Sequence, residues 1–276
     1  AAVAEWDSRK DTDLKDYWPR SELPYGFMTH HLQGGVPNHG FTHWWTMFNP
    51  RQLLVDAQLL KAICCAGDHS WKTREYLLCA FQQYLRASCY GSFWNTSQDC
   101  VEPFLGSSNF HPKNTTIENT VFNSSIGRGS FRVYAERSIE AREFAMNPSD
   151  LVDVQRYRIE GATGKTEKVF PGDAVAEMGI SCGSSTDLSF IPSNSVDLVI
   201  TDPPFGGLLH YSELSDFFYV WLRLALKDKY PDYFTADYTP KSLEAVANRA
   251  REPEDPDGFY QRLLTQCWRE AHRALK

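Results

Sequence analysis

The four residues of Asp202-Pro-Pro-Phe205, which directly follow a short apolar run, have the clearest chemical potential in this chain. An ionised carboxylate such as that of Asp202 accepts hydrogen bonds from an amine. The two prolines fix the backbone and remove two N–H donors, so the Pro203 carbonyl can face the same amine without a competing donor. Phe205 supplies a flat face for stacking. This spacing predicts a site that binds a planar ring bearing an exocyclic amine.

The apolar run before this turn predicts the element that positions it. The segment from Val196 to Ile200 is almost entirely apolar, which is typical of a strand covered on both faces of a parallel sheet. Ligands of such α/β proteins bind at the carboxyl ends of strands, where Asp202 stands. The sequence therefore predicts an α/β fold with Asp202 at the edge of a parallel sheet. A plain turn remains the alternative, because Asp and Pro favour turns by themselves.

Three segments around this turn resemble one enzyme family. They are the entry loop Leu188–Ser195, the turn itself and the helical segment His210–Arg223. Together they resemble the S-adenosylmethionine-dependent amino-methyltransferases of DNA, and in particular the large prokaryotic adenine-specific DNA methylases. The segment Asn49–Leu54 is similar to the same branch. The resemblance covers roughly residues 40–276 and is strongest over 183–223.

The resemblance implies methyl transfer from S-adenosylmethionine to the exocyclic amine of a DNA base, with adenine N6 as the first candidate. Such a base must be flipped out of the duplex before it can react. The resemblance makes Asp202, Pro203, Pro204 and Phe205 the catalytic residues and double-stranded DNA the partner. Three alternatives stay open: cytosine N4, an amine in RNA, and a noncatalytic nucleic-acid-binding module of a larger assembly.

The resemblance also implies two places for the cofactor. Ser184 or Asp187 would accept a hydrogen bond from the adenine amine of S-adenosylmethionine, and a plain loop is the alternative. Asn49 and Arg51 would bind the carboxylate of the cofactor, because a helix start and an arginine both favour a negative group. An ordinary capped helix is the alternative for this second pair.

A glycine-rich cofactor turn, which a complete enzyme of this kind needs, is not evident. The segment Ile126–Phe131 contains two glycines, but no apolar strand precedes it, so we interpret it as a surface loop. We therefore expect a Rossmann-like methyltransferase sheet that is incomplete in this chain and that further segments of the same parent protein complete. We also expect the chain by itself to bind S-adenosylmethionine weakly or not at all.

The pattern divides the chain into three predicted regions. These are an arm or linker over 1–48, a helical and loop-rich region over 49–150 and a catalytic methyltransferase region over 151–276. In the last region, apolar segments predict sheet strands near 168–170 and 178–182. The predicted fold class is thus α/β, with a helical and loop-rich N-terminal part.

Capping residues followed by helical apolar spacing predict several helices. These begin after Asn49, near Ser70, after Ser212 and after Asp255. The apolar stripe of the helix after Ser212 is interpreted as core. Between this helix and the last one, the charged and proline-rich stretch 227–257 predicts a mobile excursion above the site.

Composition limits the class of protein. Hydrophobic residues make up 42% of the 276 residues and aromatic residues 14%, which is enough for a packed core. The chain lacks an apolar run of membrane-spanning length and the pattern of a secretory leader. Its seven cysteines include no C-x-x-C pair, and an odd number disfavours a full disulfide framework. We therefore expect reduced thiols and a cytoplasmic protein.

Charge and histidine spacing bear on the partners. The net charge of −7 opposes nonspecific DNA binding, so the basic residues must cluster on one face or another segment must supply the phosphate contacts. No acidic or cysteine partner stands at ligand spacing from the histidines of the N-terminal part, so we predict no metal site. These histidines are His30, His31, His39 and His43.

Overall fold

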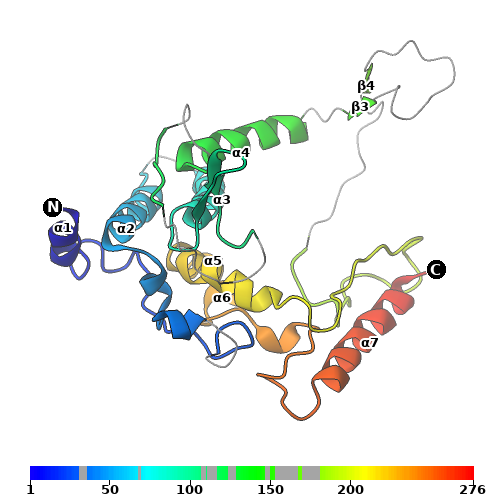
Figure 1. Cartoon of the computed structure of the whole chain (residues 1–276). Helices are drawn as coiled ribbons and strands as arrows, with labels where there is room; N and C mark the ends of the chain where they lie inside the picture. Colours follow the sequence, from blue (N-terminus) through cyan, green and yellow to red (C-terminus); the bar gives the residue numbers. More distant parts are fainter. Residues whose placement is uncertain are drawn as a thin grey trace.

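The computed structural model is mainly helical and is drawn in Figure 1. It describes residues 1–30, 36–67, 70–106, 110, 117–123, 129–146, 150–152, 167–169 and 181–276. The α-helices in these ranges are α1 (Ala2–Arg9), α2 (Pro50–Cys64), α3 (Trp71–Ala87), α4 (Phe131–Met146), α5 (Tyr211–Leu226), α6 (Pro231–Phe234) and α7 (Pro256–Ala274). Short 3-10 helices lie at η1 (Val36–His39), η2 (Trp44–Met47) and η3 (Lys241–Leu243).

The β-structure consists of short antiparallel pairs. Strand β1 (Phe93–Asn95) pairs with β2 (Cys100–Glu102), and β3 (Asp150–Val152) pairs with β4 (Glu167–Val169). A parallel Rossmann-like sheet is not present among the described residues, so the part of the prediction that holds is a chain with both helices and strands. The strand predicted near 168–170 corresponds to β4, although residue 170 lies outside the described ranges.

The strand predicted over 178–182 is not found where the structure can show it. Residues 178–180 lie outside the described ranges, and Ser181 and Cys182 have no strand pairing and are exposed.

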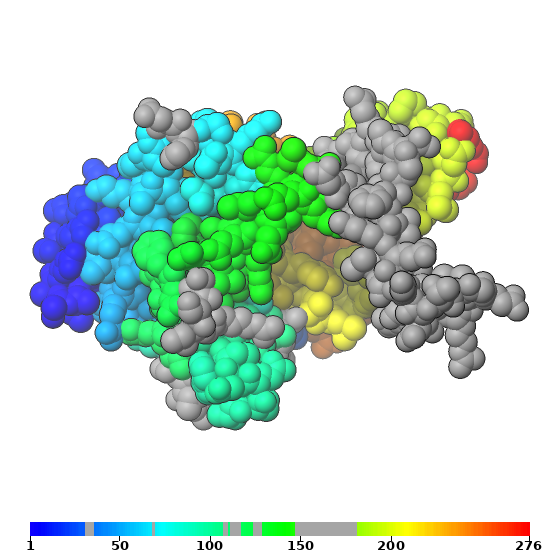
Figure 2. Space-filling model, turned by 90° about the horizontal axis from the view of Figure 1, so that it is seen from above, coloured from blue at the N-terminus to red at the C-terminus, as the bar shows by residue number. Residues whose placement is uncertain are grey.

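Of the segment Ile126–Phe131, which the sequence predicts to be a surface loop, only residues 129–131 are described. Gly129 has a φ of +87°, and the hydroxyl of Ser130 accepts a hydrogen bond from the Val133 N–H at 3.3 Å at the start of α4. In Figure 2, α4 lies against α3.

Helix α5 provides the centre of the core. Its Phe217 and Trp221 side chains are fully buried. Phe48, just before α2, stacks on Phe217 with ring centroids 5.8 Å apart and meets the edge of Trp221 at 5.4 Å. Phe81 of α3 also meets Trp221 edge to face, with ring centroids 5.8 Å apart. Aromatic pairs at these distances add to the energy of burial, and the prediction that the α5 stripe is core is confirmed.

The N-terminal residues depart from the predicted arm. Trp6 of α1, Leu14 and Trp18 are buried in the core cluster, and α1 packs on α2. The rings of Trp6 and Trp18 meet edge to face at 5.3 Å. A few large side chains bury enough apolar area to anchor this segment without forming a periodic pattern, which is why the sequence suggested an arm. The predicted region 1–48 thus contributes side chains to the core of the helical body, and the bounds of the three predicted regions stay a prediction.

The stretch 227–257 is anchored to α5, in contrast to the predicted mobile excursion. The buried carboxylate of Asp216 accepts hydrogen bonds from the Thr239 N–H at 2.9 Å and from the Lys241 ammonium. At the start of α5, the Ser212 N–H donates to the Glu244 carboxylate at 2.8 Å. Such charge-assisted bonds hold the charged and proline-rich segment against the helix.

Helix α2 carries a buried carboxyl group with no compensating contact. Asp56 is fully buried, and neither side-chain oxygen has a hydrogen-bond partner in the described structure. Desolvation by this burial raises the pKa of Asp56 well above the ordinary value of an aspartate. The folded chain thus keeps a proton on Asp56 at pH values at which the unfolded chain has lost it. The contribution of Asp56 to the free energy of unfolding is therefore most favourable below a pH of about 4, and it is lost as pH rises toward the raised pKa.

We predict that Asp56→Ala stabilises the chain at pH 7 by about 1–3 kcal/mol, because it removes an unsatisfied buried acid at the cost of a small cavity. The gain shrinks as pH falls toward 4, about the ordinary pKa of aspartate. Urea unfolding of both chains between pH 4 and 7 measures it. Asp228→Ala, which removes an exposed carboxylate, is the control and should show no such trend. An Asp56→Ala chain less stable than wild type at pH 7 would contradict the prediction.

Candidate functional site

The turn Asp202–Phe205 lies in an exposed loop beside α7 (Figure 1). Asp202 is exposed, and Phe205 retains 65% of its exposed area. The Leu208 N–H donates to the Phe205 carbonyl at 3.2 Å, which closes the turn after the aromatic residue. Gly206 within it has a φ of +57°, a left-handed conformation that glycine adopts without strain. The local sequence thus forms a tight reversal that presents Phe205 outward.

The segment that leads into the turn is not the buried strand that its composition predicts. Val196 forms a parallel bridge with Leu275: the Val196 N–H donates to the Ala274 carbonyl at 2.9 Å. Beyond this bridge, Leu198 is 68% and Ile200 84% exposed. The prediction that this segment is buried is wrong. Among the described residues, the backbone pairing with Leu275 ends at Val196, and no other element covers the side chains of Leu198 and Ile200. The apolar segment lies exposed, with Asp202 at its end.

Two contacts hold the turn from the rest of the chain. The Tyr260 hydroxyl of α7 donates to the Pro204 carbonyl at 2.8 Å. The Ala247 N–H donates to the Gly206 carbonyl at 3.1 Å. A Cβ atom on Gly207 would stand 2.7 Å from the Ala247 carbonyl oxygen, so the approach of these two backbones requires glycine. The backbone of the turn is therefore held by α7, through Tyr260, and by Ala247.

The turn also carries acceptors that the described residues leave without donors. The Asp202 carboxylate and the Pro203 carbonyl make no hydrogen bond there, in contrast to the Pro204 carbonyl. Next to them lies the exposed ring of Phe205. A carboxylate, a carbonyl and an aromatic face within four residues can accept both hydrogens of an amine and stack on its ring.

Ser184 and Asp187 lie in a polar loop with internal hydrogen bonds. The Ser184 hydroxyl lies 2.7 Å from the Thr186 hydroxyl. The Asp187 carboxylate accepts from the Ser189 N–H at 3.0 Å, and this bond lowers the pKa of Asp187 from its usual value. Both side chains therefore form hydrogen bonds within their own loop. These bonds are compatible with a plain structural loop and also with a binding role.

Helix α7 connects this loop with the turn. Arg273 near the end of α7 donates to the Leu188 carbonyl at 2.7 Å and to the Ile191 carbonyl at 3.0 Å. Tyr260, which holds the turn, lies near the start of the same helix. With a rise of 1.5 Å per residue, the two anchoring residues are about 20 Å apart along the helix. The loop that contains Ser184 and Asp187 and the turn Asp202–Phe205 therefore both contact α7, but at opposite ends of this helix.

Asn49 and Arg51 lie at the start of α2, on the far side of α5 from α7 (Figure 1). The side-chain oxygen Oδ1 of Asn49 accepts from the N–H groups of Arg51 and Gln52, both at 2.9 Å, as the predicted helix cap. The Asn49 amide also donates to the Glu118 carboxylate at 2.6 Å, and the Arg51 guanidinium contacts that carboxylate at 2.8 Å. This pair therefore does bind a carboxylate, which here belongs to the chain itself, and it is not brought next to the turn.

A buried polar network that the sequence does not predict lies directly after the turn. Buried His210 stacks on Phe27 with ring centroids 4.2 Å apart. The buried Glu213 carboxylate accepts from the N–H groups of Phe27 at 3.0 Å and Met28 at 2.8 Å, and from the Asn248 amide at 2.8 Å. Desolvation lowers the pKa of His210, while the nearby Glu213 charge opposes this shift. The one available signal was the spacing of His210 and Glu213, which lie one helical turn apart.

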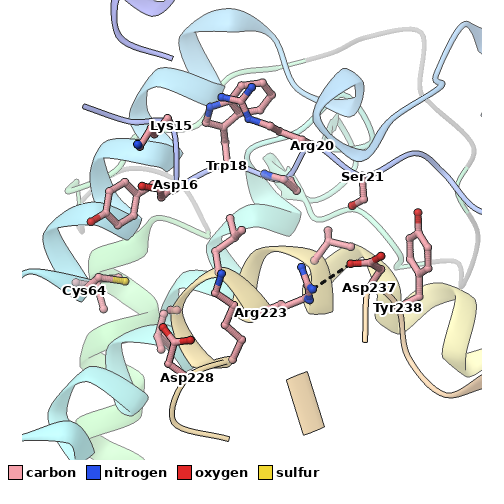
Figure 3. A pocket seen from close by; sticks show the side chains of 18 of the residues that line it. Lys15, Asp16, Trp18, Arg20, Ser21, Cys64, Arg223, Asp228, Asp237 and Tyr238 are labelled. Carbon is pink, nitrogen blue, oxygen red and sulfur yellow. Dashed lines mark ion pairs between the residues drawn. The ribbon is translucent and has the colours of Figure 1, made fainter. Parts of the chain in front are cut away.

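A cavity of about 940 Å³ lies away from the turn, between the segment 15–22, the helices α2 and α3, and α5 (Figure 3). Ile63, Leu78 and Val220 contribute apolar side chains to its wall. At its rim, Arg223 forms an ion pair with Asp237 at 3.0 Å. No residue that the sequence predicts for a site lines this cavity, and no motif in the sequence signalled it.

Several general properties can be stated for the described part of the chain. No group of three or more His, Cys, Asp or Glu side chains gathers there as a metal site would require. The helices that the structure describes include none with the length and apolar composition needed to cross a membrane. The seven cysteines form no disulfide with one another.

Comparisons of the chain with protein-family models, with curated proteins and with solved structures gave no match. They therefore assign neither a family nor a fold. A function for the chain is therefore inferred from the chemistry of the turn and from its resemblance to a known motif.

Proposed function

We propose that this chain transfers a methyl group from S-adenosylmethionine to the exocyclic amine of a flipped DNA base, with adenine N6 as the preferred target. The observation that carries the proposal is the turn itself, where the exposed Asp202 and the exposed Phe205 ring flank two prolines, and where the Pro203 carbonyl has no hydrogen-bond donor among the described residues. The resemblance of Asp202-Pro-Pro-Phe205 and its flanks to the DNA amino-methyltransferases supports it. Within this proposal, further segments of the same parent protein complete the Rossmann-like sheet.

In the proposed reaction, the residues of the turn orient the base. The Asp202 carboxylate would accept a hydrogen bond from one amine N–H and the Pro203 carbonyl from the other, which would draw the nitrogen lone pair out of conjugation with the ring. The N–C bond would form as the S–C bond of the cofactor breaks, and the amine would release one proton. Phe205 stacks on the ring, and the base must leave the duplex to reach this turn. The bound cofactor supplies the methyl group. Much of the rate enhancement would come from holding the amine in the reactive orientation.

The residues proposed for the cofactor fit its chemistry in part. The contacts of Asn49 and Arg51 with Glu118 show that this pair can bind a carboxylate, as the methionine end of S-adenosylmethionine requires. Asp187 keeps an exposed carboxylate that can accept from an adenine amine. Both places stay part of the proposal, although the structure does not bring Asn49 and Arg51 next to the turn and Glu118 occupies this pair.

The proposal is tested by identifying the modified nucleoside. The protein in its full natural length is incubated with S-adenosylmethionine and duplex DNA, and the DNA is digested and measured by mass spectrometry. We expect N6-methyladenine. N4-methylcytosine would retain the amine chemistry and change the base, and a parallel incubation with RNA tests the other substrate. If no methylated nucleoside forms with any of these nucleic acids, the enzyme proposal fails and the noncatalytic binding module takes its place.

We predict that Phe205→Ala lowers methylation about 5- to 150-fold, the equivalent of about 1–3 kcal/mol of base stacking. Phe205→Tyr and Phe205→Trp should retain most activity, because stacking needs an aromatic face. The ring is exposed, so none of these changes should lower the melting temperature. Phe190→Ala removes a similarly exposed ring and is the matched control. A Tyr variant as damaged as the Ala variant would argue against stacking.

A further inference from the structure

We propose that Tyr260 is a positioning residue for the turn: its hydroxyl holds the Pro204 carbonyl so that the Pro203 carbonyl and the Asp202 carboxylate face the substrate amine. This inference rests on the proposed function and extends it to a residue that no motif indicates. The hydroxyl donates to the Pro204 oxygen at 2.8 Å. Since 56 positions separate the two residues, the bond is a tertiary contact and not a local turn.

Tyr260 determines which of the two proline carbonyls stays available to a substrate amine. Pro203 and Pro204 each offer a carbonyl acceptor, and neither has an N–H donor. An acceptor that is already bonded to Tyr260 is less available to a substrate amine. Because proline fixes φ at about −65°, the orientation of the Pro204 carbonyl restricts that of the Pro203 carbonyl before it. Holding one carbonyl therefore helps to set the direction of the other.

A second anchor acts two residues further on. The Ala247 N–H donates to the Gly206 carbonyl at 3.1 Å. The turn is thus held at residues 204 and 206, and Phe205 lies between these points with its ring exposed. This arrangement fixes the backbone of the turn while leaving its carboxylate and its ring accessible, as a site that must receive a substrate requires.

Tyr260 is itself well placed to act as an anchor. Helix α7 begins with Pro256, and the Asp255 carboxylate accepts from the Gly258 N–H at 3.0 Å at the helix start. Tyr260 follows in the second turn of the helix and is not a member of the buried core cluster. Removal of its hydroxyl should therefore loosen the turn and leave the helical body unchanged.

The first test uses the 276-residue chain and needs no activity. Tyr260→Phe removes the hydroxyl and keeps the ring, and hydrogen–deuterium exchange with mass spectrometry follows the peptide that contains residues 205–209. We expect exchange about two- to tenfold faster in this peptide, which is the effect of losing one hydrogen bond. Exchange in α2, α3 and α5 and the melting temperature should stay as in wild type. Tyr233→Phe, which removes an exposed hydroxyl without a partner in the described residues, is the matched control.

Unchanged exchange at residues 205–209 in Tyr260→Phe would overturn the proposal, whatever the activity of the protein. The second test measures methylation by the protein in its full natural length, where we expect kcat to fall and the KM for DNA to stay unchanged, because orientation of the amine matters in the transition state. A loosened turn with unchanged kcat would also overturn the positioning role. If the wild-type protein methylates nothing, the proposed function fails, and the exchange result alone decides whether Tyr260 holds the turn.

Discussion

Asp202→Ala should reduce methylation by about 100- to 1000-fold or more, the range found when a preorganised polar group is removed from a reacting centre. The reason is specific to this residue: its carboxylate is the charged acceptor of the turn and ends the segment that leads from Val196. Asp202 is exposed and makes no hydrogen bond in the described structure, so the melting temperature should not change. Methyl incorporation into DNA by the full natural length of the protein measures the effect.

Two further variants sharpen this test. Asp202→Asn keeps one oxygen acceptor and loses the charge, so its activity should lie between those of wild type and Asp202→Ala. Asp197→Ala removes another exposed carboxylate of the same segment, which forms a surface ion pair with Lys276 at 2.7 Å, and should leave activity nearly unchanged. Turnover near the wild-type level in Asp202→Ala would remove the basis of the proposed function.

The helices α2, α3, α5 and α7 were predictable because their signals are local. Asn49 before Pro50, Ser70, and Asp255 before Pro256 cap helices that start where the sequence predicts. The apolar stripe of α5 is likewise core. In each case, residues within one or two turns of each other determine the result, so a single sequence contains the information.

The strand and the anchors of the turn were harder to predict, because their partners are distant in the chain. The apolar composition of Val196–Ile200 is typical of a buried strand, but a strand is buried only if other elements cover it. Composition does not show whether such elements are present, and Ile200 lies exposed. Hydrogen bonds from Tyr260 and Ala247 to the turn have no spacing signature. The residue types of the candidate site could thus be predicted, while the residues that hold it could be found only from the structure.

The network that follows the turn leads to the second large expected effect. The Glu213 carboxylate is buried and accepts hydrogen bonds from Phe27, Met28 and Asn248. A Cβ atom on Gly26 would stand 2.6 Å from this carboxylate, so the N-terminal segment wraps closely around it. Glu213→Ala would leave two backbone N–H groups and one amide without their acceptor. Buried donors that lose a charged partner are costly to the folded state.

We therefore predict that Glu213→Ala lowers the free energy of unfolding by about 3–5 kcal/mol. Glu213→Gln should lose less, because it keeps one acceptor oxygen and the volume of the side chain. Glu254→Ala, at an exposed position, is the control and should change stability by less than about 0.5 kcal/mol. Urea unfolding at neutral pH measures all three variants. If Glu213→Ala were as stable as wild type, the contact between residues 26–28 and the start of α5 would contribute little to the free energy of unfolding.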